Sequence, residues 1–181
     1  MSVDFRESVT KENLMRAFAG ESQARNRYTF AAAQAKKEHL HVVEAVFNYT
    51  ADQERQHAYI FYQHLKEMAG ETIQIDGGYP VDISPDMDKL LRMAQHNEYE
   101  EHDDVYKNFG DKAKEEGFTQ IANSFHMIAD IEKFHGDRFG KFAQYLECGY
   151  IHWGKEAPKK CPVCSHDQGY FIRLELSPFA H

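Results

Sequence analysis

The sequence lacks the features of a membrane protein, a secreted protein or a nucleic-acid binder. No run approaches the roughly 18 apolar residues of a membrane span, and residues 1–15 contain no apolar core of a secretory signal. Positive charge is in deficit, with 21 Lys and Arg against 29 Asp and Glu, and the net charge of −8 argues against a phosphate-binding surface. We expect a soluble, cytoplasmic protein with neither membrane nor nucleic-acid partners, for which metal ligands fit better.

Cysteine is also scarce. The three cysteines, Cys148, Cys161 and Cys164, all lie in the last quarter of the chain. An odd number without a secretory context favours metal ligation over disulfides. A thiolate site built from two facing turns needs two Cys-x-x-Cys pairs. The second pair is complete, but Cys148 represents the first alone, with Tyr145 where its partner would stand.

What the sequence does contain is long helical periodicity. A length of 181 residues with 42% hydrophobic content suffices for one principal domain with a small appendage. Apolar residues spaced alternately by four and three predict helices over about 10–37, 43–70, 85–115 and 118–142. Thr10 is the predicted N-cap of the first helix, and Ser84-Pro85 is the predicted start of the third.

The connections between these helices predict the fold. Residues 70–84 read as a long irregular connection, whereas the other two links are short. Short loop, long crossover and short loop are typical of a ferritin-like four-helix bundle with one crossover. We therefore predict an all-α fold, with the bundle in residues 1–146 and a small module in residues 147–181.

Six acidic and histidine residues interrupt the apolar stripes and should face the core. Each half of the bundle offers one glutamate and, one helix later, a Glu-x-x-His motif, in which both side chains lie on one helix face. Buried carboxylates without partners cost several kcal/mol each, and a pair of cations is the simplest remedy. A lone Glu-x-x-His is common on solvated helix faces, but two inward copies match the template of carboxylate di-iron bundles. The predicted ligands, suited to iron or manganese, are Glu21, Glu54, His57, Glu98, Glu132 and His135.

Three further residue types near this cluster have less certain roles on sequence grounds. Glu101 is a seventh inward residue, and the fifth acid, which the template does not require. Tyr28 and Tyr106 are either ordinary bundle aromatics or hydrogen-bond donors to metal-bound carboxylates. The remaining histidines considered are expected to be packing or surface residues: His64, His102 and His126.

The sequence as a whole resembles the rubrerythrins. The matching segments, in order along nearly the whole chain, are AFAGESQARNRY (17–28), Glu54-x-x-His57, NEYEEHDDVY (97–106), IEKFHGDRF (131–139) and EAPKKCPVCSHDQGYF (156–171). The resemblance implies two non-haem irons in the bundle and a rubredoxin-like iron centre at the C-terminus. It also implies reduction of hydrogen peroxide to water in oxidative-stress defence, in a homodimer or higher homo-oligomer.

The resemblance also assigns roles to individual residues. Glu54 and Glu132 would bridge the irons, Glu21 and Glu98 would be terminal carboxylates, and His135 would bind one iron permanently. On the other iron, His57 in the reduced state would alternate with Glu101 in the oxidised state. We group Glu101 and His57 with Tyr28 as the catalytic residues. Electrons would come through the rubredoxin-type centre or from an external donor, rubredoxin or an NAD(P)H-dependent reductase.

The C-terminal module departs from the family pattern. Only 13 residues separate His135 from Cys148, and GDRFGKFAQYLE still reads as helix, so the usual linker and first cysteine turn have no room. The junction is either a natural or engineered deletion, or a segment is missing from the sequence. Three thiolates with a fourth ligand could hold iron or zinc, the candidates being His152, His166, water or a group from another subunit. The alternative is a tail without metal.

Two other functions compete with the peroxidase. A ferritin-like protein that oxidises and stores iron would need no electron-transfer tail and should assemble as a hollow shell. An electron carrier would have a di-iron centre that never meets peroxide. Glu101 and the retained cysteines favour the peroxidase.

Overall fold

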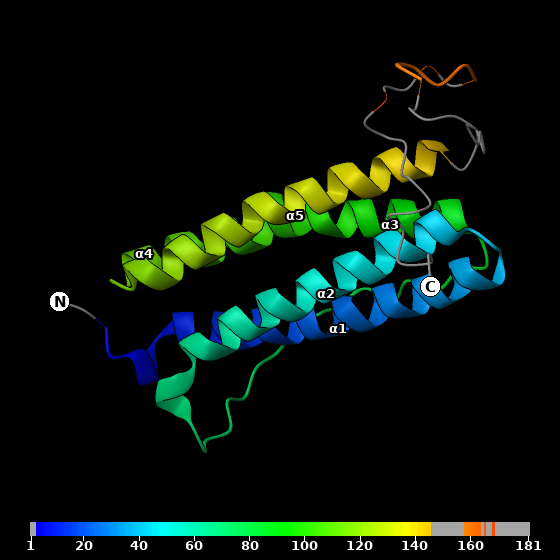
Figure 1. Cartoon of the computed structure of the whole chain (residues 1–181). Helices are drawn as coiled ribbons and strands as arrows, with labels where there is room; N and C mark the ends of the chain where they lie inside the picture. The colour runs from blue at the N-terminus through cyan, green and yellow to red at the C-terminus, as the bar shows by residue number, and fades with distance from the viewer. Residues whose placement is uncertain (1–2, 146–157, 164, 166–167, 169–181) are drawn as a thin grey trace.

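The computed structural model describes residues 3–145, 158–163, 165 and 168 (Figure 1). Its helices are α1 (Val9–Lys37), α2 (His41–His64), α3 (Met87–Glu100), α4 (Tyr106–Glu115) and α5 (Thr119–Tyr145), with a π-helical turn, η3 (Glu101–Val105), between α3 and α4. Two short 3-10 turns, η1 (Phe5–Glu7) and η2 (Lys66–Met68), flank the first helix pair. The predicted all-α bundle is confirmed, with α3, η3 and α4 forming one long interrupted helix.

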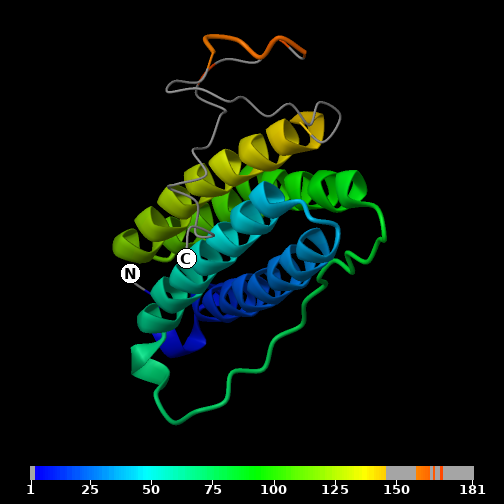
Figure 2. The same cartoon turned by 45° about the vertical axis from the view of Figure 1, so that its right-hand side comes forward.

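The bundle consists of two helix pairs joined by the crossover. α1 packs mainly against α2, and α3 and α4 pack against α5. Figure 2 shows the crossover leaving the end of η2, running along the side of α1 and reaching α3 at the opposite end of the bundle. Among the described residues, no helix combines the length and apolar character that a membrane span requires.

The two N-cap residues predicted from the sequence, Thr10 and Ser84, were each wrong by two positions. The N-cap of α1 is Ser8, whose side chain accepts from the amide of Lys11. Thr10 lies inside the first turn, where its buried hydroxyl donates to Glu116 at 2.6 Å. The N-cap of α3 is Asp86, which accepts from the Lys89 amide, so the helix begins after Ser84-Pro85. In each case a second residue able to cap lay nearby, and tertiary or local contacts decided between them.

The π turn changes which residues of the third predicted helix face the core. A π turn inserts one extra residue into a helix. Glu98 is followed in the core by Tyr106, eight residues later, and then by Gly110 and Ala113. Val105, which the spacing of a regular helix would place on the same face as Glu98, is only partly buried and packs against the edge of the core. The insertion shifts the helix phase by one residue, so the third predicted helix is interrupted and not regular along its whole length.

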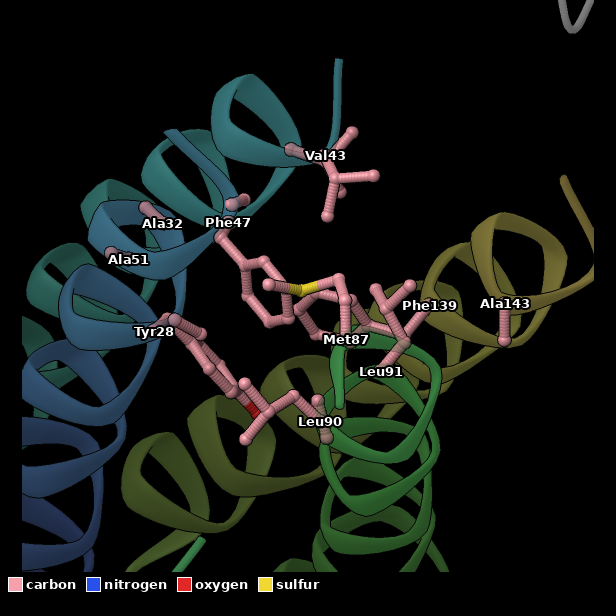
Figure 3. Packing of buried hydrophobic residues seen from close by; sticks show 14 of the residues in the cluster. Tyr28, Ala32, Val43, Phe47, Ala51, Met87, Leu90, Leu91, Phe139 and Ala143 are labelled. Carbon is pink, nitrogen blue, oxygen red and sulfur yellow. The ribbon is translucent and has the colours of Figure 1, made fainter. Parts of the chain in front are cut away.

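The apolar core is divided into two clusters. One gathers residues of α1, α2, α3 and α5, and in it the Tyr28 ring of α1 packs against Phe47 of α2 and Phe139 of α5, with ring centroids 5.9 and 5.1 Å away (Figure 3). The other includes Leu14, Phe61, Tyr106 and Phe125. On every helix of the bundle, the predicted metal ligands fall between the stretches that supply these two clusters. Packing on both sides thus holds the ligand backbones in place.

Candidate metal centre

The six predicted ligands come from four helices and are all buried. Glu21 lies on α1, Glu54 and His57 on α2, Glu98 on α3, and Glu132 and His135 on α5. His57 is the most exposed, at 5%. The i and i+3 spacing in Glu-x-x-His places each pair on one helix face, and the face points between the two apolar clusters.

The structure brings these residues into two overlapping groups. Glu21, Glu54, His57 and Glu132 form one, and Glu54, Glu98, Glu132 and His135 form the other; in each, one ligand atom per residue lies within 4.8 Å of the rest. Glu54 and Glu132 belong to both groups, as expected of carboxylates that bridge two ions. This sharing is the arrangement expected of a dinuclear site rather than of two separate ones.

Within the groups, histidine nitrogens and glutamate oxygens lie close together but not in the geometry of hydrogen bonds. Nδ1 of His57 lies 2.8 Å from Oε1 of Glu132, and Nδ1 of His135 lies 2.8 Å from Oε2 of the same residue. Nevertheless both nitrogens, both oxygens of Glu54 and Glu132, and Oε2 of Glu21 and of Glu98 have no hydrogen-bond partner. Buried polar atoms are rarely left unpaired, and each such atom costs about 1–3 kcal/mol. Lone pairs that converge without bonding one another are what cations would satisfy, so the residues fit a two-metal centre.

The pKa values of the metal-free cluster also indicate that positive charge would stabilise it. Burial, and then the Glu132 and Glu54 carboxylates, raise the pKa of Glu21 well above its usual range. Burial and Glu54 likewise raise the pKa of Glu98 to about 8. Burial alone would lower the pKa of His57, but Glu132 and Glu54 raise it to about 10. Without metal, the protein therefore holds protons where cations would otherwise sit.

In the metal-free cluster, the pKa values of His135 and Glu54 shift in opposite directions. Burial acts to lower the pKa of His135, but the carboxylates of Glu132, Glu54 and Glu98 raise it to about 12. Burial acts to raise the pKa of Glu54, but His135 and His57 lower it to about 2. Without metal, an ionised Glu54 therefore lies between two protonated histidines. With metal, two cations would take the place of the two protons, and Glu54 would bridge them.

Two buried tyrosines hold the terminal carboxylates. The hydroxyl of Tyr106 donates to Oε1 of Glu21 at 2.6 Å, and the hydroxyl of Tyr28 donates to Oε1 of Glu98. Burial, reinforced by neighbouring carboxylates, raises the pKa of both phenols, so they remain neutral donors. Each bond joins the two halves of the bundle, and each leaves the other oxygen of its glutamate directed at the cluster. Both tyrosines are therefore placed as hydrogen-bond donors to the site.

Glu101 lies beside the cluster but outside both groups of ligand atoms. It is the first residue of the π turn and is partly buried. Burial raises its pKa well above the usual range, and the charges of Glu98, Glu132 and Glu54 add to the effect. These interactions place this fifth carboxylate close to the centre, whereas His57 is one of the six grouped ligands.

The other histidines named from the sequence lie outside the two groups. His64 contacts Ser124 Oγ at 2.9 Å, His102 contacts Asp103 at 2.7 Å, and His126 contacts Asp111 at 3.2 Å. Sequence reasoning did not single out Arg27, which is paired with Asp82 of the crossover and stacks over the Tyr28 ring at 5.4 Å. A basic residue directly before Tyr28 was the available signal, but its partner lies 55 residues away.

The predicted cysteine site falls largely outside the described residues. Cys148 and Cys164 lie there, as do His152 and His166. Cys161 is described and is 5% exposed, and its carbonyl accepts from the amide of Ser165 at 2.9 Å. The three-cysteine metal site therefore stays a prediction.

The fold and the site define a class: a ferritin-like helix bundle with a carboxylate-rich dimetal centre. The family model described as Rubrerythrin matches residues 12–143, and the one described as Rubrerythrin, rubredoxin-like domain, matches residues 146–172. The chain belongs to the rubrerythrin family. The family implies a non-haem di-iron centre, which the residues of the cluster fit.

Individual relatives and solved structures agree with this assignment. The chain is 41% identical to a rubrerythrin of Clostridium perfringens over 90% of this chain and 92% of that protein. It is 43% identical to Rubrerythrin-1 of Clostridium acetobutylicum over the same shares. A fully reduced, all-ferrous nigerythrin superposes with a TM-score of 0.68 at 29% identity, over 95% of this chain and 88% of that one. A Desulfovibrio desulfuricans bacterioferritin, at 22% identity and a TM-score of 0.67 over 76% and 80%, shows the ferritin-like fold alone.

Proposed function

We propose that this protein is a non-haem di-iron peroxidase that reduces hydrogen peroxide to water in oxidative-stress defence. The reaction consumes one peroxide, two electrons and two protons and yields two waters. The six buried ligands would hold the two irons, which in their reduced state would supply the two electrons of the reaction. The observation that carries the proposal is Glu101, an additional carboxylate that begins a π turn beside the two ligand groups without belonging to either.

The chain's own residues account for how such a centre would be held through a redox cycle. Tyr28 and Tyr106 orient Glu98 and Glu21 by hydrogen bonds, so the terminal ligands stay fixed. Glu101 and His57 would exchange on one metal, with His57 at the centre in the present arrangement. Replacing a neutral imidazole by a carboxylate compensates the charge that oxidation adds. A π turn is a common device at functional sites where a helix must reposition a side chain.

The electron source and assembly are further parts of the proposal. Electrons would reach the centre through the rubredoxin-like segment at residues 146–172, or from rubredoxin or an NAD(P)H-dependent reductase. We propose a cytoplasmic homodimer or higher homo-oligomer, in which a module of one subunit serves the bundle of another. The C-terminal segment would hold iron or zinc through Cys148, Cys161 and Cys164 with a fourth ligand.

The test is a comparison of oxidants. The iron-loaded protein is reduced without oxygen and mixed in a stopped-flow instrument with hydrogen peroxide or with dioxygen. We expect oxidation by peroxide to be the faster reaction at equal concentrations. Slower oxidation by peroxide than by dioxygen would reject the peroxidase. Assembly into an iron-filled shell would instead favour the storage function.

A further inference from the structure

A partly open cavity of about 280 Å³ lies against one side of the metal centre. Its walls come from α1, from the π turn and the start of α4, and from the crossover between η2 and α3. The end of α3 also contributes, and although most of the exposed lining surface is apolar, the lining includes these polar residues: Arg16, Gln23, Asn97, Glu100 and Glu101. Four lining residues carry the argument: Gly20, Tyr79, Glu101 and Tyr106.

The inner wall of this cavity is part of the metal centre's immediate surroundings. Tyr106 lines it and donates a hydrogen bond to Glu21 at 2.6 Å. Glu101 lines it as well, and its carboxylate interacts with those of Glu98 and Glu132. A small molecule in the cavity would therefore meet Glu101 and Tyr106 before it could reach the buried ligands.

The outer wall is a segment of the crossover fixed to the helices on both sides. Tyr79 donates from its hydroxyl to the carbonyl of Arg16 at 3.1 Å, and Asp76 pairs with the Arg16 guanidinium at 2.8 Å. Further along, Asp82 pairs with Arg27 of α1 and accepts from Asn97 of α3 at 2.8 Å. These contacts place the ring of Tyr79 over the cavity, so the crossover has a role beyond connecting two helices.

Gly20 leaves the passage between these walls open. A Cβ atom added there would lie 3.7 Å from Cε1 of Tyr79 and 3.9 Å from the hydroxyl oxygen of Tyr106, both ordinary contact distances. A methyl group would thus fit, whereas a longer side chain would fill the space between the two rings. Glycine in the middle of a helix costs roughly 0.5–1 kcal/mol relative to alanine, and the position has an ordinary helical backbone.

We infer that this cavity is the entry and binding site for small hydroperoxides, and that Gly20 and Tyr79 determine which substrates reach the centre by their size. The inference rests on the proposed peroxidase function and deepens it. For any hydroperoxide ROOH, two electrons and two protons give ROH and water. Hydrogen peroxide would pass the Tyr79 ring freely, whereas a bulky tertiary alkyl hydroperoxide would be hindered by it.

Two pairs of variants test the route. Tyr79→Ala removes the ring, and Tyr79→Phe keeps the ring but removes the hydroxyl. Gly20→Leu fills the passage, and Gly20→Ala adds only a methyl group. Oxidation of the anaerobically reduced protein is followed with hydrogen peroxide and with tert-butyl hydroperoxide, on variants whose metal content matches the wild type. A readout that needs no metal is xenon binding in pressurised crystals of the metal-free protein, because apolar cavities take up xenon.

The expected results differ for the two positions. In Tyr79→Ala, the rate with tert-butyl hydroperoxide rises about tenfold relative to hydrogen peroxide, the size of effect that pocket contacts produce, and Tyr79→Phe keeps the wild-type ratio. In Gly20→Leu, xenon is lost from the cavity and the hydrogen peroxide rate falls about tenfold, whereas Gly20→Ala retains both. A wild-type rate and ratio in Tyr79→Ala, or loss of xenon in Gly20→Leu with an unchanged peroxide rate, overturns the inference.

These outcomes separate the inference from the function on which it rests. If the wild-type protein is not oxidised by hydrogen peroxide, the proposed function itself fails. If it is oxidised at a rate that neither Tyr79→Ala nor Gly20→Leu changes, the function stands and the route is wrong. Should Gly20→Leu fail to fold, the Tyr79 pair alone decides the question.

Discussion

The stability of the metal-free protein should fall as the pH rises above neutrality. Five buried or partly buried groups at the cluster have a raised pKa: His57 at about 10, His135 at about 12, Glu98 at about 8, and Glu21 and Glu101 well above the usual range. In the unfolded chain, these groups release their protons near their ordinary pKa values of 6.5 for histidine and 4.5 for glutamate. From about pH 7 to about pH 9 the folded state therefore binds more protons than the unfolded state, and stability must decrease with pH.

The magnitude follows from the number of protons retained. Each proton contributes a slope of about 1.4 kcal/mol per pH unit. His57 and His135 both remain protonated across this pH range, so the two histidines alone contribute a slope of about 3 kcal/mol per pH unit, and each glutamate that keeps its proton adds to it. Water molecules buried beside the cluster would make the slope of stability against pH smaller without changing its sign. Glu54, whose pKa is lowered to about 2, works in the opposite direction only at acid pH.

The assay is urea denaturation of the metal-free protein at several pH values, with the metal-loaded protein as the control. Bound cations require deprotonated ligands, so the loaded protein should lose the decline above pH 7. Substituting His57→Gln should remove about one proton's share of the slope. Stability that is constant or increases from about pH 7 to about pH 9 in the metal-free protein would refute the reasoning.

Three further predictions concern single side chains. Glu116→Ala leaves the hydroxyl and amide of buried Thr10 without their acceptor and should lower the free energy of unfolding in urea melts by about 3 kcal/mol. Burial acts to raise the pKa of Glu116, but its hydrogen bonds lower it, so this contribution to stability should also be lost on acidification. Wild-type stability of the variant would argue against this role. Tyr106→Phe removes the donor to Glu21 and should weaken metal binding about tenfold in chelator competition, an effect that an unchanged affinity would exclude. Glu101→Ala should impair peroxide turnover more than iron content, and normal turnover would reject its exchange with His57.

Much of the fold and the ligand set could be predicted because both depend on helical periodicity. The 3.6-residue repeat placed Glu54 and His57 on one inward face, and the matching motif Glu132-x-x-His135 indicated the partner helix. The structure brings both motifs together with Glu21 and Glu98. Long, strongly periodic segments define their own buried face, so little tertiary information was needed.

Other features depended on contacts between residues far apart in the sequence. Ser8 and Thr10 are equally able to cap a helix, and Thr10 is recruited by Glu116, which is 106 residues away. The π turn at Glu101–Val105 shifts the helix phase, but no residue type in EHDDV marks it. Tyr79 lies in a segment without regular structure, whose position over α1 is set by ion pairs such as that of Asp76 with Arg16. These features are set by tertiary contacts, which local propensity does not predict.

The central claim is that six buried ligands, one of which exchanges with Glu101, hold a dinuclear iron centre whose two electrons go to peroxide. The most direct test is an anaerobic titration of the iron-loaded, reduced protein with hydrogen peroxide, followed by the absorbance of the oxidised centre. Because one peroxide takes up two electrons, we predict an end point at one peroxide for every two irons held in the bundle. An end point at one peroxide per iron, or the absence of oxidation by peroxide while dioxygen still oxidises the centre, would contradict the account.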